Sequence, residues 1–200
     1  MGYESRQRNL VRTWETTVQP TVEPVTLAEL KNRLRILTCD FDNELTDILK
    51  MARKQVEADS YRRLITQTVV GYLDCWLPAR EIELRLAPIS AVSSIAYIDD
   101  NGDSQTFASS RYHTDFKSTP PRIILKTNED WEETEENTPN AITITCTAGY
   151  GSTAATVPVE ARLAIVEYAR SVWSGCEGST ALYQRLLSAV QWTAYHRINV

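Results

Sequence analysis

Residues 24–37 read PVTLAELKNRLRIL, a short stretch with a full set of helix-start signals. Thr26 can accept a hydrogen bond from the backbone N–H of Glu29, and the Glu29 carboxylate can accept one from the N–H of Thr26, which makes a capping box. Val25 and Leu30 occupy the two positions of a hydrophobic staple. A helix of about ten residues is marginal in water, so capping worth about 1 kcal/mol indicates a short helix that must hold its place.

Three further segments have the periodicity of helices. The first spans residues 43–61, the second is 158–173 with Pro158 as its first residue, and the third runs from about Ala181 to Tyr195. The apolar stripe predicted for 43–61 comprises Leu45, Ile48, Leu49, Met51, Ala52 and Val56, with Lys50, Arg53, Lys54, Glu57 and Asp59 on the other faces. All three segments are therefore predicted to be amphipathic helices.

Between residues 65 and 148 the apolar period changes to two, which is typical of half-buried strands. EIELRL at 81–86 alternates Ile and Leu with charged residues, and AITITCTA at 141–148 alternates apolar residues with threonine. The sequence thus predicts an α+β protein with a helical bundle from the N- and C-terminal parts and a small, mostly antiparallel sheet inserted in the middle of the chain. The predicted parts are an extended arm at 1–23, a helical part at 24–63, a β-rich part at 64–150, a core helix at 156–174 and a C-terminal helix or tail at 180–200.

Composition restricts the classes of function. The chain has 200 residues, a formal net charge of −5 and a pI near 5.2, which argues against a protein that binds nucleic acid by neutralising phosphates but not against one that lets DNA slide past. No signal peptide or membrane-length apolar run is apparent, so we expect a soluble protein made in the cytoplasm. The four cysteines show no metal-type spacing and are expected to be free thiols in a reducing compartment.

Two polar segments could be read as ion sites. IDDNGDSQTF places Asp99, Asn101 and Asp103 at alternate positions, as at the start of a calcium loop, but Asn-Gly between strands is a hairpin signal and Ser110 stands where the bidentate Glu belongs. We therefore expect a turn. NEDWEETEEN carries six carboxylates around Trp131 and is interpreted as a solvated loop with an electrostatic role. These carboxylates are Glu129, Asp130, Glu132, Glu133, Glu135 and Glu136.

Catalytic motifs are lacking: the sequence has no GxSxG, HExxH, P-loop or GxGxxG pattern, and we expect no enzyme activity, metal or cofactor. His113 and His196 each stand alone, which favours structural or surface roles. The chief alternative from another class is a small hydrolase using paired carboxylates such as Glu81 and Glu83. Because both lie on the polar face of a regular alternation, a solvated surface is the simpler explanation.

The order of these pieces resembles a known family. The resemblance lies in the order of its segments: EPVTLAELKNRLRI, an acidic break, DNELTDILKMARKQVEADSYRRLITQT, the strands, and TPNAITITCTAGYG followed by a helix that begins at Val-Pro. In this order the chain resembles the head-tail connector (adaptor) proteins of tailed bacteriophages and gene transfer agents. The resemblance covers about Glu23 to Trp173. The acidity of residues 128–137 and the length of the arm depart from the family pattern.

The resemblance implies a structural protein of the virion neck that is synthesised and assembled in the host cytoplasm. Such proteins form a ring, usually twelve-fold, under the portal protein and receive the stopper or tail-completion protein below, while DNA passes through the channel without specific binding and no membrane is involved. The C-terminal segment is then expected to contact the portal, and deletion of residues 181–200 to abolish that contact while leaving the fold intact. The candidate anchors are Tyr183, Leu186, Trp192 and Tyr195.

The acidic segment acquires a role in this reading. A ring of twelve copies carries about −60, and a channel of that sign repels phosphates. We therefore expect the carboxylates of residues 129–136 to face the channel or its lower rim. A stopper or tail terminator of the same neck remains an alternative, although those proteins are expected to be dominated by β-structure.

Overall fold

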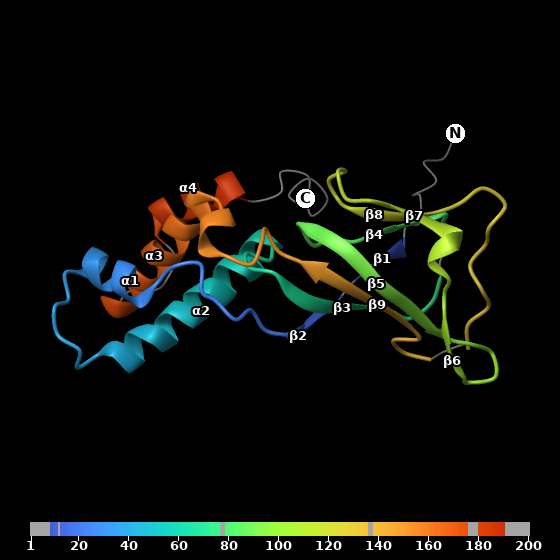
Figure 1. Cartoon of the computed structure of the whole chain (residues 1–200), viewed down its shortest axis with the longest axis horizontal. Helices are drawn as coiled ribbons and strands as arrows, with labels where there is room; N and C mark the ends of the chain where they lie inside the picture. The colour runs from blue at the N-terminus through green and yellow to red at the C-terminus, as the bar shows by residue number, and fades with distance from the viewer. Residues whose placement is uncertain (1–8, 12, 77–78, 136–137, 176–179, 191–200) are drawn as a thin grey trace. The chain divides into compact units, whose positions relative to one another are not determined.

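The computed structural model describes residues 9–11, 13–76, 79–135, 138–175 and 180–190, with Asn9 and Leu10 as backbone alone. The chain divides into two compact units. The first comprises residues 1–19 and 67–148, and the second comprises residues 20–66 and 149–200, so the chain passes between the units three times. The described strands lie in the first unit and the described α-helices in the second (Figure 1), which confirms the α+β class.

The helical unit is built around α3. The described helices are α1 (Leu27–Leu34), α2 (Asp42–Ser60), α3 (Val159–Trp173) and α4 (Ala181–Val190), with a 3-10 turn at Ala154–Thr156. α3 packs against α2 and α4, and α1 lies against α2. All four helices contribute buried apolar side chains to one hydrophobic cluster. The last predicted helix is shorter than expected within the described residues, since residues 191–200 lie outside them.

The capping box of α1 is present as the sequence predicts. The backbone N–H of Thr26 donates to Glu29 Oε2 at 2.8 Å, and the N–H of Glu29 donates to Thr26 Oγ1 at 3.2 Å. Val25 and Leu30 are both buried in the helical cluster, as the staple requires. Arg35 ends the helix in the left-handed region, with φ 60°. A helix of eight residues is thus fixed at both ends.

The predicted stripe of α2 needs correction at three positions. Met51 is 43% exposed, whereas Arg53 and Glu57 are buried. The two charged side chains can be buried because they satisfy each other: Arg53 Nη1 lies 3.0 Å from Glu57 Oε2, and Arg53 Nε lies 2.8 Å from Glu23. The second oxygen of Glu57 accepts the backbone N–H of Leu64 at 2.9 Å. Periodicity alone assigns such paired charges to the surface.

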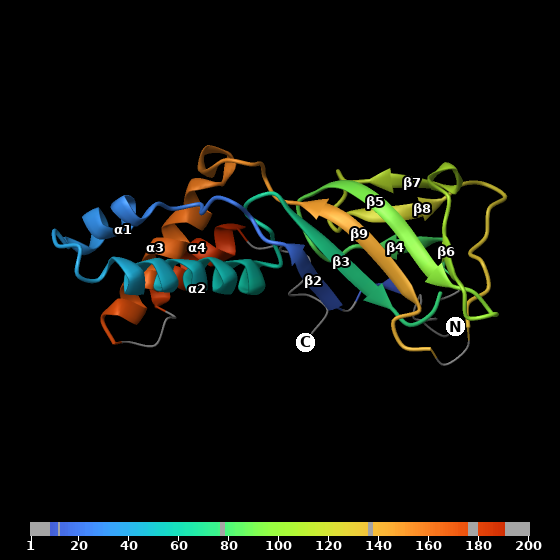
Figure 2. The ribbon, with the colours of Figure 1, turned by 60° about the horizontal axis from the view of Figure 1, so that its bottom comes forward.

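The first unit contains two sheets where the sequence predicted one (Figure 2). The larger has the order β2 (Thr13–Val18), β3 (Gln67–Leu73), β9 (Ile142–Ala148), β5 (Ile89–Ile98) and β6 (Ser104–Thr106), all antiparallel. The smaller has the order β1 (Asn9–Leu10), β4 (Glu81–Glu83), β8 (Arg122–Leu125) and β7 (Tyr112–Asp115). In the smaller sheet β1 runs parallel to β4 and the other pairs are antiparallel. TWETTV, within the predicted arm, is therefore β2.

Both sheets bury one face in a common hydrophobic cluster. Strands with period two have one apolar face, and two sheets packed face to face cover both such faces. In β9 the apolar residues alternate as predicted, from Ile142 to Ala148, and all of them are buried. Around β4 the isoleucine and leucines are buried as predicted, but Glu83 is buried too, with Arg85 at 3.8 Å.

Candidate docking surfaces

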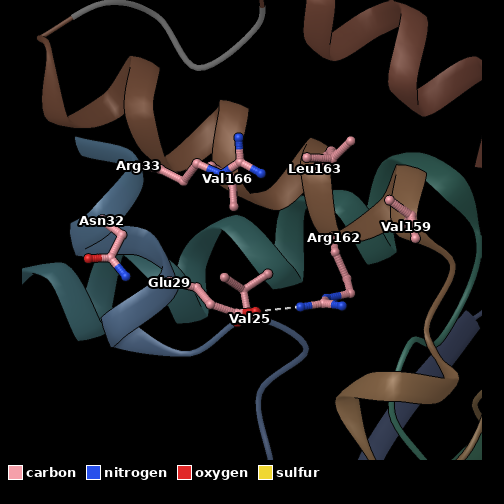
Figure 3. Close-up of a pocket in the computed structure, with 8 residues that line it drawn as sticks. All are labelled: Val25, Glu29, Asn32, Arg33, Val159, Arg162, Leu163 and Val166. Carbon is pink, nitrogen blue, oxygen red and sulfur yellow. Dashed lines mark hydrogen bonds and ion pairs between the residues drawn. The ribbon is translucent and has the colours of Figure 1, made fainter. Parts of the chain in front are cut away.

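A groove runs along α3 of the helical unit. It consists of two adjoining hollows of about 310 and 300 Å³ that share Arg33, Leu163 and Val166. Figure 3 shows the first hollow, with α1 on one side and α3 on the other. We call the whole surface the α3 groove. Its other lining residues are Val25, Glu29, Asn32, Val159 and Arg162 in the first hollow, and Glu167, Arg170, Leu182 and Leu186 in the second.

The capping carboxylate of α1 also builds this groove. Glu29 Oε1 accepts from Arg162 Nη2 at 2.6 Å, and Arg162 Nε donates to the carbonyl oxygen of Pro24 at 3.1 Å. One guanidinium on α3 thus holds the start of α1 (Figure 3). The backbone N–H of Thr26, helped by Arg162, lowers the pKa of Glu29. The short helix is therefore fixed by its cap and by an ion pair to its neighbour.

The groove is lined by both aliphatic and charged side chains, and its arginines exceed its carboxylates by one. Val159 is 61% exposed and Leu182 is 48% exposed. Arg162 is paired with Glu29, and Arg170 is paired with Glu167 at 2.8 Å. The sequence reasoning did not identify this surface.

Arg33 differs from the other two arginines of the groove. Among the described residues it has no carboxylate partner, although its side chain lines both hollows. An unpaired guanidinium beside exposed aliphatic side chains is suited to a ligand that carries both a carboxylate and an apolar group.

The predicted portal anchors on α4 lie in different surroundings. Tyr183 is 1% exposed, and its hydroxyl donates to Asp59 Oδ2 at 2.6 Å, with Tyr168 packed beside it. Its side chain is thus part of the core of the unit. Leu186 is half-buried and lines the α3 groove. Trp192 and Tyr195 lie outside the described residues.

The acidic segment at residues 129–135 is held in place by contacts that its composition does not suggest. Arg111 binds the side chains of both Glu129 and Glu132, and its Nη2 donates to the carbonyl oxygen of Asp130 at 2.9 Å. These contacts raise the pKa of Arg111. One guanidinium therefore binds two of the six predicted carboxylates and balances one of their two negative charges.

Trp131 anchors the same segment. Its ring lies against those of Trp76 and Phe107, and its Nε1 donates to the carbonyl oxygen of Ala79 at 2.7 Å. Nearby, the backbone N–H of Glu135 donates to the carbonyl oxygen of Ile98 at 3.2 Å. The segment is therefore fixed to the unit that contains the sheets. The interpretation as a solvated loop did not include these contacts.

The remaining carboxylates differ in exposure. Asp130 and Glu133 are exposed, and Asp130 lies 3.8 Å from Arg80. Glu135 accepts from the hydroxyl of Thr138 at 2.8 Å. Glu136 lies outside the described residues. Of the described carboxylates in this segment, Asp130 and Glu133 are thus the two that are exposed to solvent.

The candidate ion site at residues 99–103 is a turn. Asp99 Oδ1 accepts the backbone N–H groups of Asn101 and Asp103, both at 3.0 Å, and these contacts lower the pKa of Asp99. Gly102 has φ 83°, and the turn joins β5 to β6. The hairpin prediction is confirmed, and the described residues contain no cluster of three metal-ligating side chains.

The alternative carboxylate pair is divided between two environments. Glu81 pairs with Arg122 at 3.2 Å, whereas Glu83 is buried near Arg85. His113 is exposed on β7, and His196 lies outside the described residues. In the described part of the chain, no helix is both long and apolar enough to cross a membrane.

Comparison with known proteins places the fold. No protein-family model and no curated protein matches the chain. A chain from the neck of an empty gene transfer agent (GTA) particle, computed with C6 symmetry, has a TM-score of 0.75 and 19% identity. The match covers 90% of this chain and 95% of that chain.

Two further solved structures agree. A chain from the virion of a native GTA particle has a TM-score of 0.74 and 18% identity, and one from the neck of a native GTA particle, computed with C12 symmetry, has 0.72 and 18%. Each match covers 90% of this chain and 95% of the other. The chain therefore has the fold of these GTA particle proteins over nearly its whole length.

Proposed function

We propose that this chain is a structural, non-enzymatic component of the neck of a phage-like particle, and specifically a head-tail connector (adaptor). The observation that carries the proposal is the TM-score of 0.75 to a GTA neck protein over 90% of the chain. The similar structures come from particles treated with C6 and C12 symmetry, which supports a ring of copies. In this role the protein extends the DNA channel under the portal and receives the stopper or tail, after synthesis in the host cytoplasm.

The C-terminal part of α4 and the residues after it are the proposed portal contact. Leu186 lies on α4 and lines the second hollow of the α3 groove, and Trp192 and Tyr195 follow the helix in the sequence as candidate aromatic anchors of the kind that interfaces favour. Tyr183 contributes indirectly, because its buried ring holds α4 on the unit.

The acidic segment is proposed to face the channel or its lower rim. Its exposed Asp130 and Glu133 are part of the net charge of −5 per copy, which is repeated around the ring. A negative wall does not retain DNA phosphates, so the genome can pass without binding.

The test is negative-stain microscopy of the purified protein, with solution mass measured in parallel and after mixing with the portal protein of the same particle. Closed rings with an axial hole wide enough for duplex DNA, alone or on the portal, are expected. A protein that stays monomeric and leaves the portal unbound would overturn the proposal.

The portal contact is tested with a truncation at residue 190. Deletion from Ala181, as the sequence suggested, would also remove Tyr183, Leu187 and Val190 from the core. Deletion of residues 191–200 retains α4, so unchanged circular dichroism with lost portal binding is the expected result. Unchanged portal binding would remove this segment from the contact.

A further inference from the structure

The loop between α1 and α2 presents an apolar side chain to solvent. Leu37 is 95% exposed, and Thr38, Cys39 and Asp40 beside it are exposed too. Figures 1 and 2 both show this loop at one end of the helical unit. A single exposed leucine is ordinary on a protein surface. Exposure alone therefore does not mark a contact surface, and the contacts that hold the loop have to be considered as well. We call residues 37–40 the knob.

The knob is fixed at both of its ends. On one side Ile36 packs on the helical cluster, and its N–H donates to the carbonyl oxygen of Lys31 at 3.0 Å. On the other side Asp42 forms an ion pair with Lys31 at 2.6 Å, and Phe41 contacts the ring of Trp173 edge-on, with centroids 5.3 Å apart. Leu37 is therefore held in the exposed position by a braced loop.

The knob and the α3 groove have complementary chemistry. The groove offers Leu163, Val166 and Leu182 around an unpaired Arg33, and the knob offers Leu37 and Asp40. Among the described residues Asp40 has no cationic partner, just as Arg33 has no acidic one. Each surface thus offers aliphatic side chains that the other can cover, and a charge opposite to the unpaired charge of the other.

Ring symmetry supplies the reason for two different surfaces. In a ring of six or twelve copies each interface is head-to-tail, so one patch of a copy meets a different patch of the next. The acidic segment is a poorer occupant of the groove, because Glu129 and Glu132 are bound to Arg111 and Trp131 is packed on Trp76.

We infer that the knob of one copy inserts into the α3 groove of the next, with Leu37 against Leu163 and Leu182 and with Asp40 paired to Arg33. This contact deepens the proposed function and rests on it, since it requires a ring of copies. It assigns the residues that carry the contact between protomers to one unit of the chain.

Disulfide trapping tests the contact in the full-length protein. In a background with Cys39, Cys75 and Cys176 replaced by serine, a variant with Leu37→Cys and a variant with Leu182→Cys are oxidised separately and as an equal mixture. Cross-linked dimers are expected from the mixture alone, because each variant supplies one half of the contact. Dimers from Leu182→Cys alone would indicate a symmetric contact between grooves and overturn the inference.

The double variant Leu37→Cys with Leu182→Cys can cross-link each copy to both of its neighbours. On a non-reducing gel it is expected to give a ladder of bands, the largest of which contains as many copies as the ring. Met51→Cys in place of Leu37→Cys is the matched control, since Met51 is an exposed apolar residue of the same unit outside both surfaces, and it should give no ladder. An equal ladder from the control would overturn the inference.

Charge reversal tests the ion pair. Arg33→Glu places two carboxylates together and is expected to weaken self-association, or trapping of the double variant, about tenfold. Combining it with Asp40→Arg restores the opposite charges and should recover most of the loss. Failure of the combined variant to recover would remove this pair from the contact.

Microscopy of the wild type, compared with the cross-linking and the variants, distinguishes failure of the knob contact from failure of the connector proposal. Rings without Leu37 to Leu182 cross-links overturn the knob contact and leave the connector proposal standing. Rings that persist with Leu37→Asp but vanish on deletion of residues 191–200 would assign the contact to that segment instead. Absence of rings, portal binding and cross-links together would overturn both proposals.

Discussion

Trp131 lies flat on Trp76, with ring centroids 4.4 Å apart and ring planes 9° from parallel. Trp131→Ala removes this stack and the hydrogen bond to the carbonyl oxygen of Ala79, and should lower the free energy of unfolding by about 2–3 kcal/mol. Trp131→Phe keeps an aromatic ring and should cost about 1 kcal/mol. Urea denaturation measures both. A loss below about 0.5 kcal/mol for Trp131→Ala would contradict the anchoring role.

Replacing Arg111 tests the frame of the acidic segment. Arg111→Met leaves Glu129 and Glu132 without their shared cation, and should cost about 1 kcal/mol at low salt and less at 1 M salt. Amide exchange in residues 129–135 should quicken at the same time. Lys50→Met is the control, because its exposed pair with Asp47 spans 3.8 Å and should contribute almost nothing. Equal effects of the two variants would contradict the special position of Arg111.

Tyr183→Phe distinguishes a core residue from an interface anchor. The variant loses the hydrogen bond to Asp59 and should reduce the stability of the isolated chain by about 1–2 kcal/mol. Burial raises the pKa of Tyr183, so its contribution is present below the unfolded pKa near 10 and is lost as pH rises above it. The phenylalanine variant should therefore lose less stability between pH 10 and 11 than wild type. Unchanged stability with weaker portal binding would instead favour a direct contact.

Asp115 provides a pH-dependent contact in the smaller sheet. Its carboxylate accepts hydrogen bonds from the hydroxyl and N–H of Ser118 and from Arg122, which lower its pKa to about 2. Because the folded pKa is depressed, the stabilisation is present above the unfolded value near 3.8 and is lost as pH falls toward 2. Ser118→Ala should raise the pKa of Asp115, measured by carboxyl NMR. An unchanged titration would show that Ser118 is not the main cause.

Gly149 marks the point where the chain leaves β9. Its φ is 136°, and a Cβ there would lie 2.5 Å from the carbonyl carbon of Ile65 and from the amide nitrogen of Thr66. Gly149→Ala should cost about 2–4 kcal/mol, because the obstacle is backbone. Gly102→Ala has positive φ but open space and should cost about 1 kcal/mol. Thermal unfolding compares them, and equal losses would contradict the steric argument.

Local signals in the sequence predicted local structure well. The capping box of Thr26 and Glu29, the hairpin at Asn101-Gly102 and the alternation from Ile142 to Ala148 all depend on residues a few positions apart. The α+β class follows from these patterns. The similarity in fold to a chain from a GTA neck agrees with the resemblance to neck proteins found in the sequence.

Features that depend on distant residues could not be predicted in this way. Periodicity placed Arg53 and Glu57 at the surface, because the sequence near Arg53 does not indicate its ion pair with Glu23, which lies 30 positions earlier in the chain. Composition likewise did not indicate the contacts that fix the acidic segment, because Trp76 and Arg111, which bind it, come from other parts of the chain. The α3 groove needs α1, α3 and α4 together, and Arg162 in a mostly apolar helix was the one signal that could have suggested it.

The three passages of the chain between its two units bear on how the protein can be cut. After a single proteolytic break at any passage, the remaining two passages still join the two units covalently. A cut after Gln19, for example, frees a peptide that still pairs with β3 through β2. Separation of the units by protease therefore requires more than one cleavage, and no contiguous fragment of the chain contains one complete unit without part of the other.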